Sequence, residues 1–528
     1  MEVPIIGRLN YRDYQALFIA IVFLFVEKLL RGITYLLPKA GVNYLREESQ
    51  RLFSMLYKDE RTLPVKLFQH AANFRELVSY WDYNVEEHIV KTKDDYILGL
   101  QRIPNGRSVG SKSMNFTLNP IQQDEEPNIE TVFKNNGISL SAIRKNPNEI
   151  KNKSSSSSSS FLQEFSESTS SSSSHQKKKF VKPVVLLYHG LMTCSELWVC
   201  NVEYENRLAC LLADAGYDVW FGNTRGNKYS MKHTKFDPSE RKFWEYSMDE
   251  MALYDLPDTI DYILEITGAP SLTYIGFSQG TAQCFAALSI NSKLNKKINL
   301  FIALAPATSP KGLRNPVIDA LMKLSPNVIY LFFGRKAVLT MALFWQKVLS
   351  PPIFTKIIDL SLRILFGWDC KNISEAQKAI GYYHLYSCLS TKSLVHWFQI
   401  IRSRNFQMYD DLPPYSYTST SLGYSCQRFP TLQITTPVAI FYGGRDSLAD
   451  MNMLLKQIPT PVLMREVLEY EHLDFLWAND VHQKVFPDIF NLLLHYNVHD
   501  NIRNYEFMDD YQNYDDIEQD EALDYSNN

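Results

Sequence analysis

Residues 272–290 read LTYIGFSQGTAQCFAALSI, in which an apolar run, a glycine-flanked serine and a helix-compatible stretch follow one another directly. The run 272–275 predicts a buried strand, and 281–290 predicts the helix after it. Gly276 and Gly280 flank Ser278, so the chain can turn sharply where the two backbones approach closely. This arrangement predicts that the Ser278 hydroxyl stands at the helix N-terminus as a nucleophile.

A serine hydroxyl is a weak nucleophile at neutral pH and needs a base, which in turn needs an orienting acid. In hydrolases with this strand–turn–helix serine, the acid and then the histidine follow later in the chain. Asp446 comes directly after the apolar run 438–442, and His472 follows a further predicted strand, 463–470. We therefore expect Ser278, Asp446 and His472 to form a catalytic triad.

Two other acids compete for the place of Asp446. Asp450 lies one helical turn further on and is more typical of the next helix. Asp474 follows His472 too closely in the sequence to be its usual partner. Asp446 remains the preferred acid.

The tetrahedral intermediate of such a reaction needs two backbone N–H donors. The residue after the nucleophile, Gln279, should supply one. The other should come from the turn after the apolar run 184–188, where we place it at Leu191. His189 in the same turn is expected to be structural, because His472 is the better placed base.

The remaining pattern predicts the fold. From Pro183 to about His495, short apolar runs alternate with helix-like segments, as in a parallel sheet with crossover helices. Residues 86–104, EEHIVKTKDDYILGLQRIP, alternate apolar and polar positions around a polar turn and predict a β-hairpin that opens the sheet. The sequence therefore predicts an α/β protein with an α/β-hydrolase core.

The stretch between the nucleophile helix and Asp446 is far longer than a crossover requires. It contains apolar patches such as SLRILFGW, residues 361–368. We interpret it as a cap with an apolar wall suited to acyl and sterol groups, and ordinary helical core packing is the alternative. If the cap exists, activity should rise when the ester is presented as an emulsion.

The N-terminus carries the strongest targeting signal. Residues 14–26, YQALFIAIVFLFV, are apolar, and a second apolar stretch follows at 29–37. The uninterrupted part is shorter than the roughly 20 residues of a membrane-spanning helix, and no small-residue cleavage site follows it. We expect a helical hairpin, a tilted span or an interfacial anchor in a membrane or lipid surface. A buried core helix is the alternative.

Two segments are predicted to be disordered. The insertion contains serine runs at 154–160 and 170–174, and the tail after Asn501 is acidic. Neither can bury enough apolar area to offset the entropy of ordering. The insertion is interpreted as a passive linker, with control by phosphorylation as the alternative. The expected organisation is therefore an anchor (1–40), an N-terminal segment that ends in the opening hairpin (41–104), the insertion (105–182), the core (183–310 and 437–500), the cap (311–436) and the tail (501–528).

Composition excludes several function classes. The chain of 528 residues is 45% hydrophobic with a formal net charge of −4, which gives no basis for binding nucleic acid. Its seven cysteines form no CxxC pair, so neither a zinc site nor a disulfide framework is indicated, and a reducing compartment fits better than secretion. No ligand cluster competes with the triad, and we expect no metal and no cofactor.

The motifs YHGLM, GYDVWFGNTRGNKYS, GFSQG, YGGRD and EHLDFLWAND, together with the hairpin sequence, resemble the acid lipase family, which includes gastric and lysosomal acid lipases. Within it, the similarity is greatest to the yeast lipid-droplet sterol esterases. The resemblance covers most of the chain outside the insertion and the tail. It departs at Phe277, because secreted members usually have histidine before the nucleophile.

This resemblance implies hydrolysis of steryl esters at a lipid surface, with triacylglycerol as a second substrate. It implies the same triad and the oxyanion donors Leu191 and Gln279. Together with the N-terminal apolar run, it indicates the lipid droplet as the location, with the endoplasmic reticulum membrane second, and it names no protein partner. A triacylglycerol lipase and a non-catalytic lipid-droplet scaffold are the alternatives, and the intact triad argues against the scaffold.

Overall fold

A single large sheet organises the chain. The computed structural model describes residues 71–107, 181–310, 312, 326–338, 340–411 and 426–497, with scattered positions between 18 and 51. Within these ranges nine strands form the sheet, in the order β1-β2-β4-β3-β6-β7-β10-β11, and β5 pairs with β2. The strands are β1 (Glu86–Lys91), β2 (Tyr96–Ile103), β3 (Val184–Tyr188), β4 (Asp218–Gly222), β5 (Lys232–His233), β6 (Leu272–Phe277), β7 (Ile298–Leu304), β10 (Val438–Gly443) and β11 (Leu463–Val467).

The directions of the strands determine at which edge of the sheet their carboxyl ends lie. The predicted hairpin is present, since β1 and β2 pair antiparallel with Val90 opposite Leu98. From β4 to β11 all neighbours are parallel. The chain places β4 on one side of β3 and β6 on the other. Sites in such sheets lie at the carboxyl ends of the strands where the order reverses, which here is beside β3.

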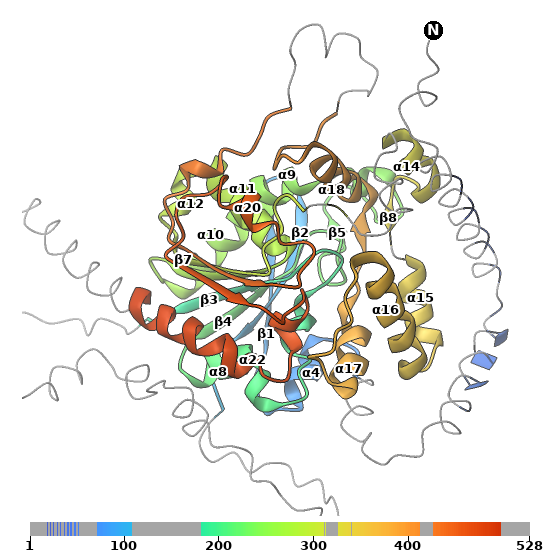
Figure 1. Cartoon of the computed structure of the whole chain (residues 1–528), viewed down its shortest axis with the longest axis horizontal. Helices are drawn as coiled ribbons and strands as arrows, with labels where there is room; N and C mark the ends of the chain where they lie inside the picture. The colour runs from blue at the N-terminus through green and yellow to red at the C-terminus, as the bar shows by residue number, and fades with distance from the viewer. Residues whose placement is uncertain are drawn as a thin grey trace, which may run out of the picture.

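Helices cover both faces of the sheet (Figure 1). Val185 and Leu187 of β3 belong to one buried cluster, and Val184 and Leu186 belong to the other. Strands buried on both faces are continuously apolar, which explains the VVLLY run. The helices used below are α4 (Phe74–Ser79), α8 (Leu208–Asp214), α10 (Leu256–Thr267), α11 (Gln279–Ile290), α12 (Ser292–Asn295), α20 (Met451–Leu454), α21 (Asp474–Trp477) and α22 (Val481–Lys484). The core clusters place α8 and α22 on one face, and α10 and α11 on the other.

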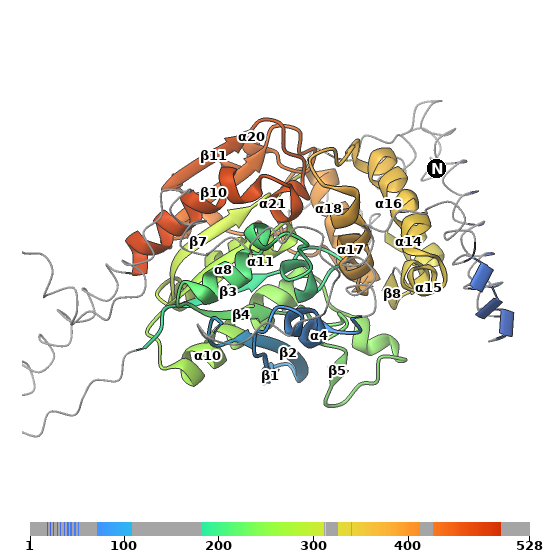
Figure 2. The same cartoon turned by 90° about the horizontal axis from the view of Figure 1, so that it is seen from below.

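The region predicted to form a cap is largely helical where the structure describes it. Its helices gather at one side of the sheet in both views (Figures 1 and 2). They are α14 (Pro326–Phe333), α15 (Thr340–Val348), α16 (Pro351–Phe366), α17 (Glu375–Leu385) and α18 (Thr391–Ser403), with a small hairpin of β8 (Ala337–Val338) and β9 (Leu389–Ser390). Two aromatic residues of this region, Trp368 after α16 and Trp397 on α18, contact the site described below.

Some predictions lie outside the described residues: most of the anchor at 1–40, nearly all of the insertion at 105–182, and the tail at 501–528. Where the structure does describe helices, none is both long and apolar enough to cross a membrane. One boundary was wrong. The strand predicted at 463–470 ends at Val467, because the Tyr470 N–H turns back to the Val467 carbonyl at 3.1 Å.

Candidate active site

The serine lies on the sharp turn that its flanking glycines predict. Ser278 connects β6 to α11 with φ 53° and ψ −118°, a conformation that non-glycine residues rarely adopt. A Cβ atom on Gly280 would lie 2.7 Å from the carbonyl oxygens of Tyr188 and His189. A Cβ atom on Gly276 would lie 2.9 Å from the backbone of Gly280. Only glycine fits at these two positions, so the turn depends on the motif.

Three side chains predicted from the sequence form one hydrogen-bonded chain. His472 Nε2 lies 2.7 Å from Ser278 Oγ, and His472 Nδ1 lies 2.7 Å from Asp446 Oδ2. The second carboxylate oxygen of Asp446 accepts the Leu448 N–H at 2.9 Å. A carboxylate can only accept, so Nδ1 carries the proton and Nε2 is left to accept the serine hydroxyl. All three residues are buried.

The two competing acids are bound elsewhere. Asp450 caps α20 and accepts a hydrogen bond from Arg404 at 2.8 Å. Asp474 accepts the Glu471 N–H at 2.6 Å and the Asn372 side-chain amide at 2.9 Å. Burial raises the pKa of Asp474 to about 6. Both carboxylates hold the protein backbone in place, and the preference for Asp446 agrees with the geometry.

The predicted oxyanion donors border the serine. Gln279 is the first residue of α11, where a backbone N–H has no intrahelical acceptor. Leu191 lies in the turn after β3. A Cβ atom on the neighbouring Gly190 would lie 3.1 Å from the Cβ of Ser278, so this turn packs directly against the nucleophile. From the cap region, the Trp397 indole of α18 donates to the Gln279 side chain at 2.6 Å.

His189 fixes the same turn. Its Nε2 accepts the Thr224 N–H at 3.0 Å, and its Nδ1 lies 2.8 Å from the Gly190 carbonyl oxygen. Burial lowers the pKa of His189 to about 4, so the ring is neutral and Nδ1 is the donor. These contacts agree with the structural role predicted for His189.

Within the part of the chain that the structure describes, two aromatic rings contact His472, and sequence reasoning missed the first of them. Trp368 stacks on the imidazole with ring centroids 5.1 Å apart and an interplanar angle of 9°. Phe277, which departs from the family pattern, lies 5.0 Å from the imidazole centroid at 50°. The apolar patch 361–368 contains Trp368, but no local pattern indicated which of its residues reaches the site.

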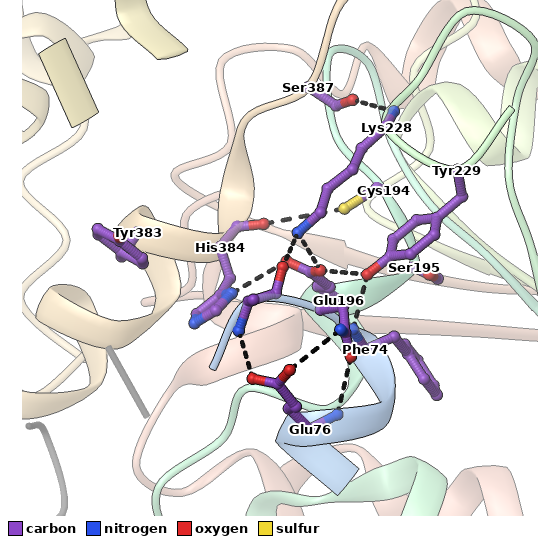
Figure 3. Close-up of polar contacts among 12 residues, drawn as sticks. Phe74, Glu76, Cys194, Ser195, Glu196, Lys228, Tyr229, Tyr383, His384 and Ser387 are labelled. Atoms are coloured by element: carbon purple, nitrogen blue, oxygen red, sulfur yellow. Dashed lines mark hydrogen bonds and ion pairs between the residues drawn. The ribbon is translucent and has the colours of Figure 1, made fainter. Parts of the chain in front are cut away.

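A second buried histidine–carboxylate pair lies elsewhere in the molecule and was not predicted. Glu196, in the short 3₁₀ helix η2 (Ser195–Trp198), accepts from His384 Nδ1 at 2.9 Å and from Lys228 Nζ at 2.6 Å (Figure 3). The Tyr229 hydroxyl also bonds to it. Burial opposes ionisation of Glu196, but hydrogen bonds and charges from His384 and Lys228 outweigh it and lower its pKa.

The described residues contain no group of three or more histidine, cysteine, aspartate or glutamate side chains that could hold a metal ion. The groups that the structure brings together at this site are the serine hydroxyl, the imidazole, the carboxylate and nearby backbone N–H groups. These are the groups of acyl transfer.

Comparison with known proteins agrees with this geometry. Residues 74–202 match the model of a partial α/β-hydrolase lipase region, and residues 183–479 match that of the α/β-hydrolase fold. A probable lipase of Schizosaccharomyces pombe is 40% identical over 93% of this chain and 93% of its own. A second probable lipase of that yeast is 38% identical over 93% of this chain and 96% of its own. Human gastric triacylglycerol lipase is 32% identical over 80% of this chain and 90% of its own.

Proposed function

The chain belongs to the α/β-hydrolase lipases and is a carboxylic ester hydrolase, and from this premise we propose that it cleaves steryl esters to sterol and fatty acid at a lipid surface. The observation that carries the proposal is the hydrogen-bonded chain from Asp446 through His472 to Ser278, with the serine on its strained turn. This is the arrangement that activates a hydroxyl for acyl transfer.

The proposed reaction proceeds through an acyl-enzyme. Ser278 Oγ attacks the ester carbonyl carbon while His472 Nε2 takes the hydroxyl proton. The backbone N–H groups of Leu191 and Gln279 stabilise the negative oxygen that forms. As the intermediate collapses, the ester C–O bond breaks and His472 returns the proton to the sterol oxygen. Water then repeats the sequence and releases the fatty acid. Asp446 holds the imidazole in the required tautomer throughout.

The substrate class rests on several observations. The sequence resembles the sterol esterases of the acid lipase family, and two aromatic residues reach the site from the region predicted to form a cap, Trp397 on α18 and Trp368 after α16. Ser278 is only 7% exposed, so a water-insoluble ester would enter through the apolar region that we interpret as a cap. A triacylglycerol lipase is the second candidate, favoured by the similarity to gastric triacylglycerol lipase.

The proposed location is the lipid droplet, with the endoplasmic reticulum membrane second. The apolar run 14–26 supports it, because a short hairpin suits a lipid monolayer better than a complete bilayer span. The helix α16 adds a second apolar surface, since Ile357, Leu360 and Ile364 share one face and are all about half exposed. Exposed apolar patches of this kind are typical of membrane contact.

The proposal is tested by hydrolysis of emulsified cholesteryl oleate and triolein, side by side. The purified protein is compared with Ser278→Ala and with Ser289→Ala, a matched control in the same helix whose hydroxyl bonds to the Ala286 carbonyl. We expect steryl ester cleavage that Ser278→Ala abolishes and Ser289→Ala preserves. Cleavage of triolein alone would support the second candidate.

Three further measurements separate the remaining alternatives. Full activity of Ser278→Ala would overturn the mechanism. Failure of a fluorophosphonate to label Ser278 in the unmodified protein would favour a non-catalytic scaffold. Equal rates on monomeric and emulsified ester would contradict the cap.

A further inference from the structure

We propose that Trp368 is a positioning residue for His472, whose indole face fixes the imidazole and stabilises the imidazolium that forms during acyl transfer. The inference rests on the proposed function, because it assigns His472 the role of the base. It goes further by assigning a role in proton transfer to a residue that lies in the region between the two halves of the core.

Stacking holds this indole against the imidazole. The rings of Trp368 and His472 are parallel within 9° and 5.1 Å apart, and Trp368 is 4% exposed. Phe366 stacks on Trp368 in turn, at 4.3 Å and 13°. The Trp368 indole N–H has no hydrogen-bond partner among the residues that the structure describes. Ring contacts, and not a polar bond of the indole, therefore set its orientation.

The backbone after Trp368 is hydrogen-bonded to the loop that carries His472. The carboxylate of Glu471, the residue before His472, accepts the backbone N–H of Asp369 at 3.0 Å and that of Cys370 at 2.7 Å. Hydrogen bonds to a charged acceptor are stronger than neutral ones. Although Trp368 follows α16 of the predicted cap, this clamp couples it to His472.

The indole also affects the reaction because the His472 ring becomes positively charged during it. When His472 accepts the Ser278 proton, its ring becomes a cation in contact with the negative face of an indole, within the roughly 6 Å over which such contacts are attractive. The other charged group facing the ring is Asp446, at 2.7 Å from Nδ1. Phe277 brings no charge, and the nearby Glu471 is occupied by the two backbone donors. The indole favours the protonated ring, and therefore the transition state, more than it favours the neutral ground state.

The experiment measures kcat, KM and the pH dependence of kcat/KM on emulsified ester for Trp368→Phe and Trp368→Leu. Trp gives the strongest contact of this kind and Leu none. We expect kcat to fall in the order Trp, Phe, Leu, by about tenfold for Leu, with KM little changed. Without the indole face, protonation of the base requires a lower pH, so the acid limb of the profile should move to lower pH in the same order.

Trp220→Phe is the matched control. Trp220 is also fully buried and also packs on a histidine, His88, with ring centroids 4.6 Å apart, but it lies on β4 away from the triad. We expect this variant to lose thermal stability and to keep the wild-type kcat and acid limb. A purely structural role of Trp368 predicts that Trp368→Phe behaves in the same way as this control.

Each outcome decides the inference. A changed KM or chain-length preference with an unmoved acid limb would make Trp368 a wall of the substrate pocket and overturn it. If Trp368→Leu does not fold, the acid limb of the kcat/KM profile of Trp368→Phe is sufficient to decide whether the inference holds. Ser278→Ala, measured in parallel, separates the two proposals. If it stays active, the proposed function fails, and if it is inactive while the Trp368 variants match the wild type, only this inference fails.

Discussion

Among the residues that the structure describes, two buried histidine–carboxylate pairs look alike at first. In both, the imidazole Nδ1 meets a carboxylate, Asp446 at 2.7 Å from His472 and Glu196 at 2.9 Å from His384. They differ in what completes the group. His472 faces the hydroxyl of Ser278, whereas Glu196 is shared with the Lys228 ammonium. A buried histidine–carboxylate pair is therefore not enough to indicate catalysis. The candidate catalytic group is the one that also has a nucleophile on a strained turn.

The Glu196 group connects parts of the fold. It joins η2 to the end of α17 through His384 and to the segment after β4 through Lys228. Tyr229 extends it to α4, because its hydroxyl accepts the Phe74 N–H at 2.6 Å. We therefore interpret it as a structural joint between the core and the helices beside the site. The joint should therefore affect stability, whereas the triad should affect kcat.

Replacing each carboxylate by its amide should lower kcat in the triad and leave kcat unchanged in the Glu196 group. Asp446→Asn can no longer hold the required imidazole tautomer, and kcat on emulsified ester should fall by about 10⁴. Glu196→Gln should retain kcat, because its partners touch neither Ser278 nor His472. The measurement is steady-state hydrolysis by folded protein. An equal loss of kcat in both variants at unchanged melting temperature would contradict the distinction.

Truncating the structural carboxylate should instead affect stability. Glu196→Ala leaves the buried His384 and the partly exposed Lys228 without their shared acceptor, and a buried donor left without a partner costs about 1–3 kcal/mol. Urea unfolding followed by fluorescence measures this change. The control is Glu265→Ala, an exposed glutamate on α10. Equal free energies of unfolding for the two variants would show that the group does not stabilise the fold.

The sequence predicted the triad because each member lies within a few residues of the end of a predicted strand: Ser278 after β6, Asp446 after β10 and His472 after β11. Parallel strands bring those ends together, so local pattern and chain order were sufficient. The β1–β2 hairpin was predictable in the same way, from its alternation.

The Glu196 group and Trp368 could not be predicted in this way. Glu196 and His384 are 188 residues apart, and neither lies in a motif. Their contact depends on how α17 packs beside η2, and the stacking of Trp368 on His472 depends on where the chain leaves α16. Periodicity reports which face of an element is buried, but it does not report which distant side chain that face meets.

Acid should affect the structural joint in a defined direction. Because the pKa of Glu196 is lowered in the folded protein, its ionised form contributes stability above the unfolded value of about 4.3. That contribution is lost as the pH falls from there through the folded pKa. We expect the unfolding free energy of the wild type to fall more steeply below this pH than that of Glu196→Gln. Parallel curves for the two proteins would exclude Glu196 as a source of acid sensitivity.

The smallest expected effect tests whether the joint and the active site are coupled. Ser387 touches both: its N–H donates to the Met192 carbonyl beside the predicted oxyanion turn at 2.7 Å, and its hydroxyl accepts the Lys228 N–H at 2.7 Å. Ser387→Ala removes only the second bond, so we expect a loss of about 1 kcal/mol in stability and an unchanged kcat. Urea unfolding and ester hydrolysis check these values.

A matched control is Ser361→Ala, which removes the hydroxyl bond to the Ile357 carbonyl on the exposed side of α16. If Ser387→Ala lowers kcat while Ser361→Ala does not, the joint controls the position of the oxyanion turn through the Met192 carbonyl. The Glu196 group and the triad would then still differ in their chemistry. They would nevertheless be coupled energetically, because the Glu196 group would help to set the position of the turn that borders Ser278.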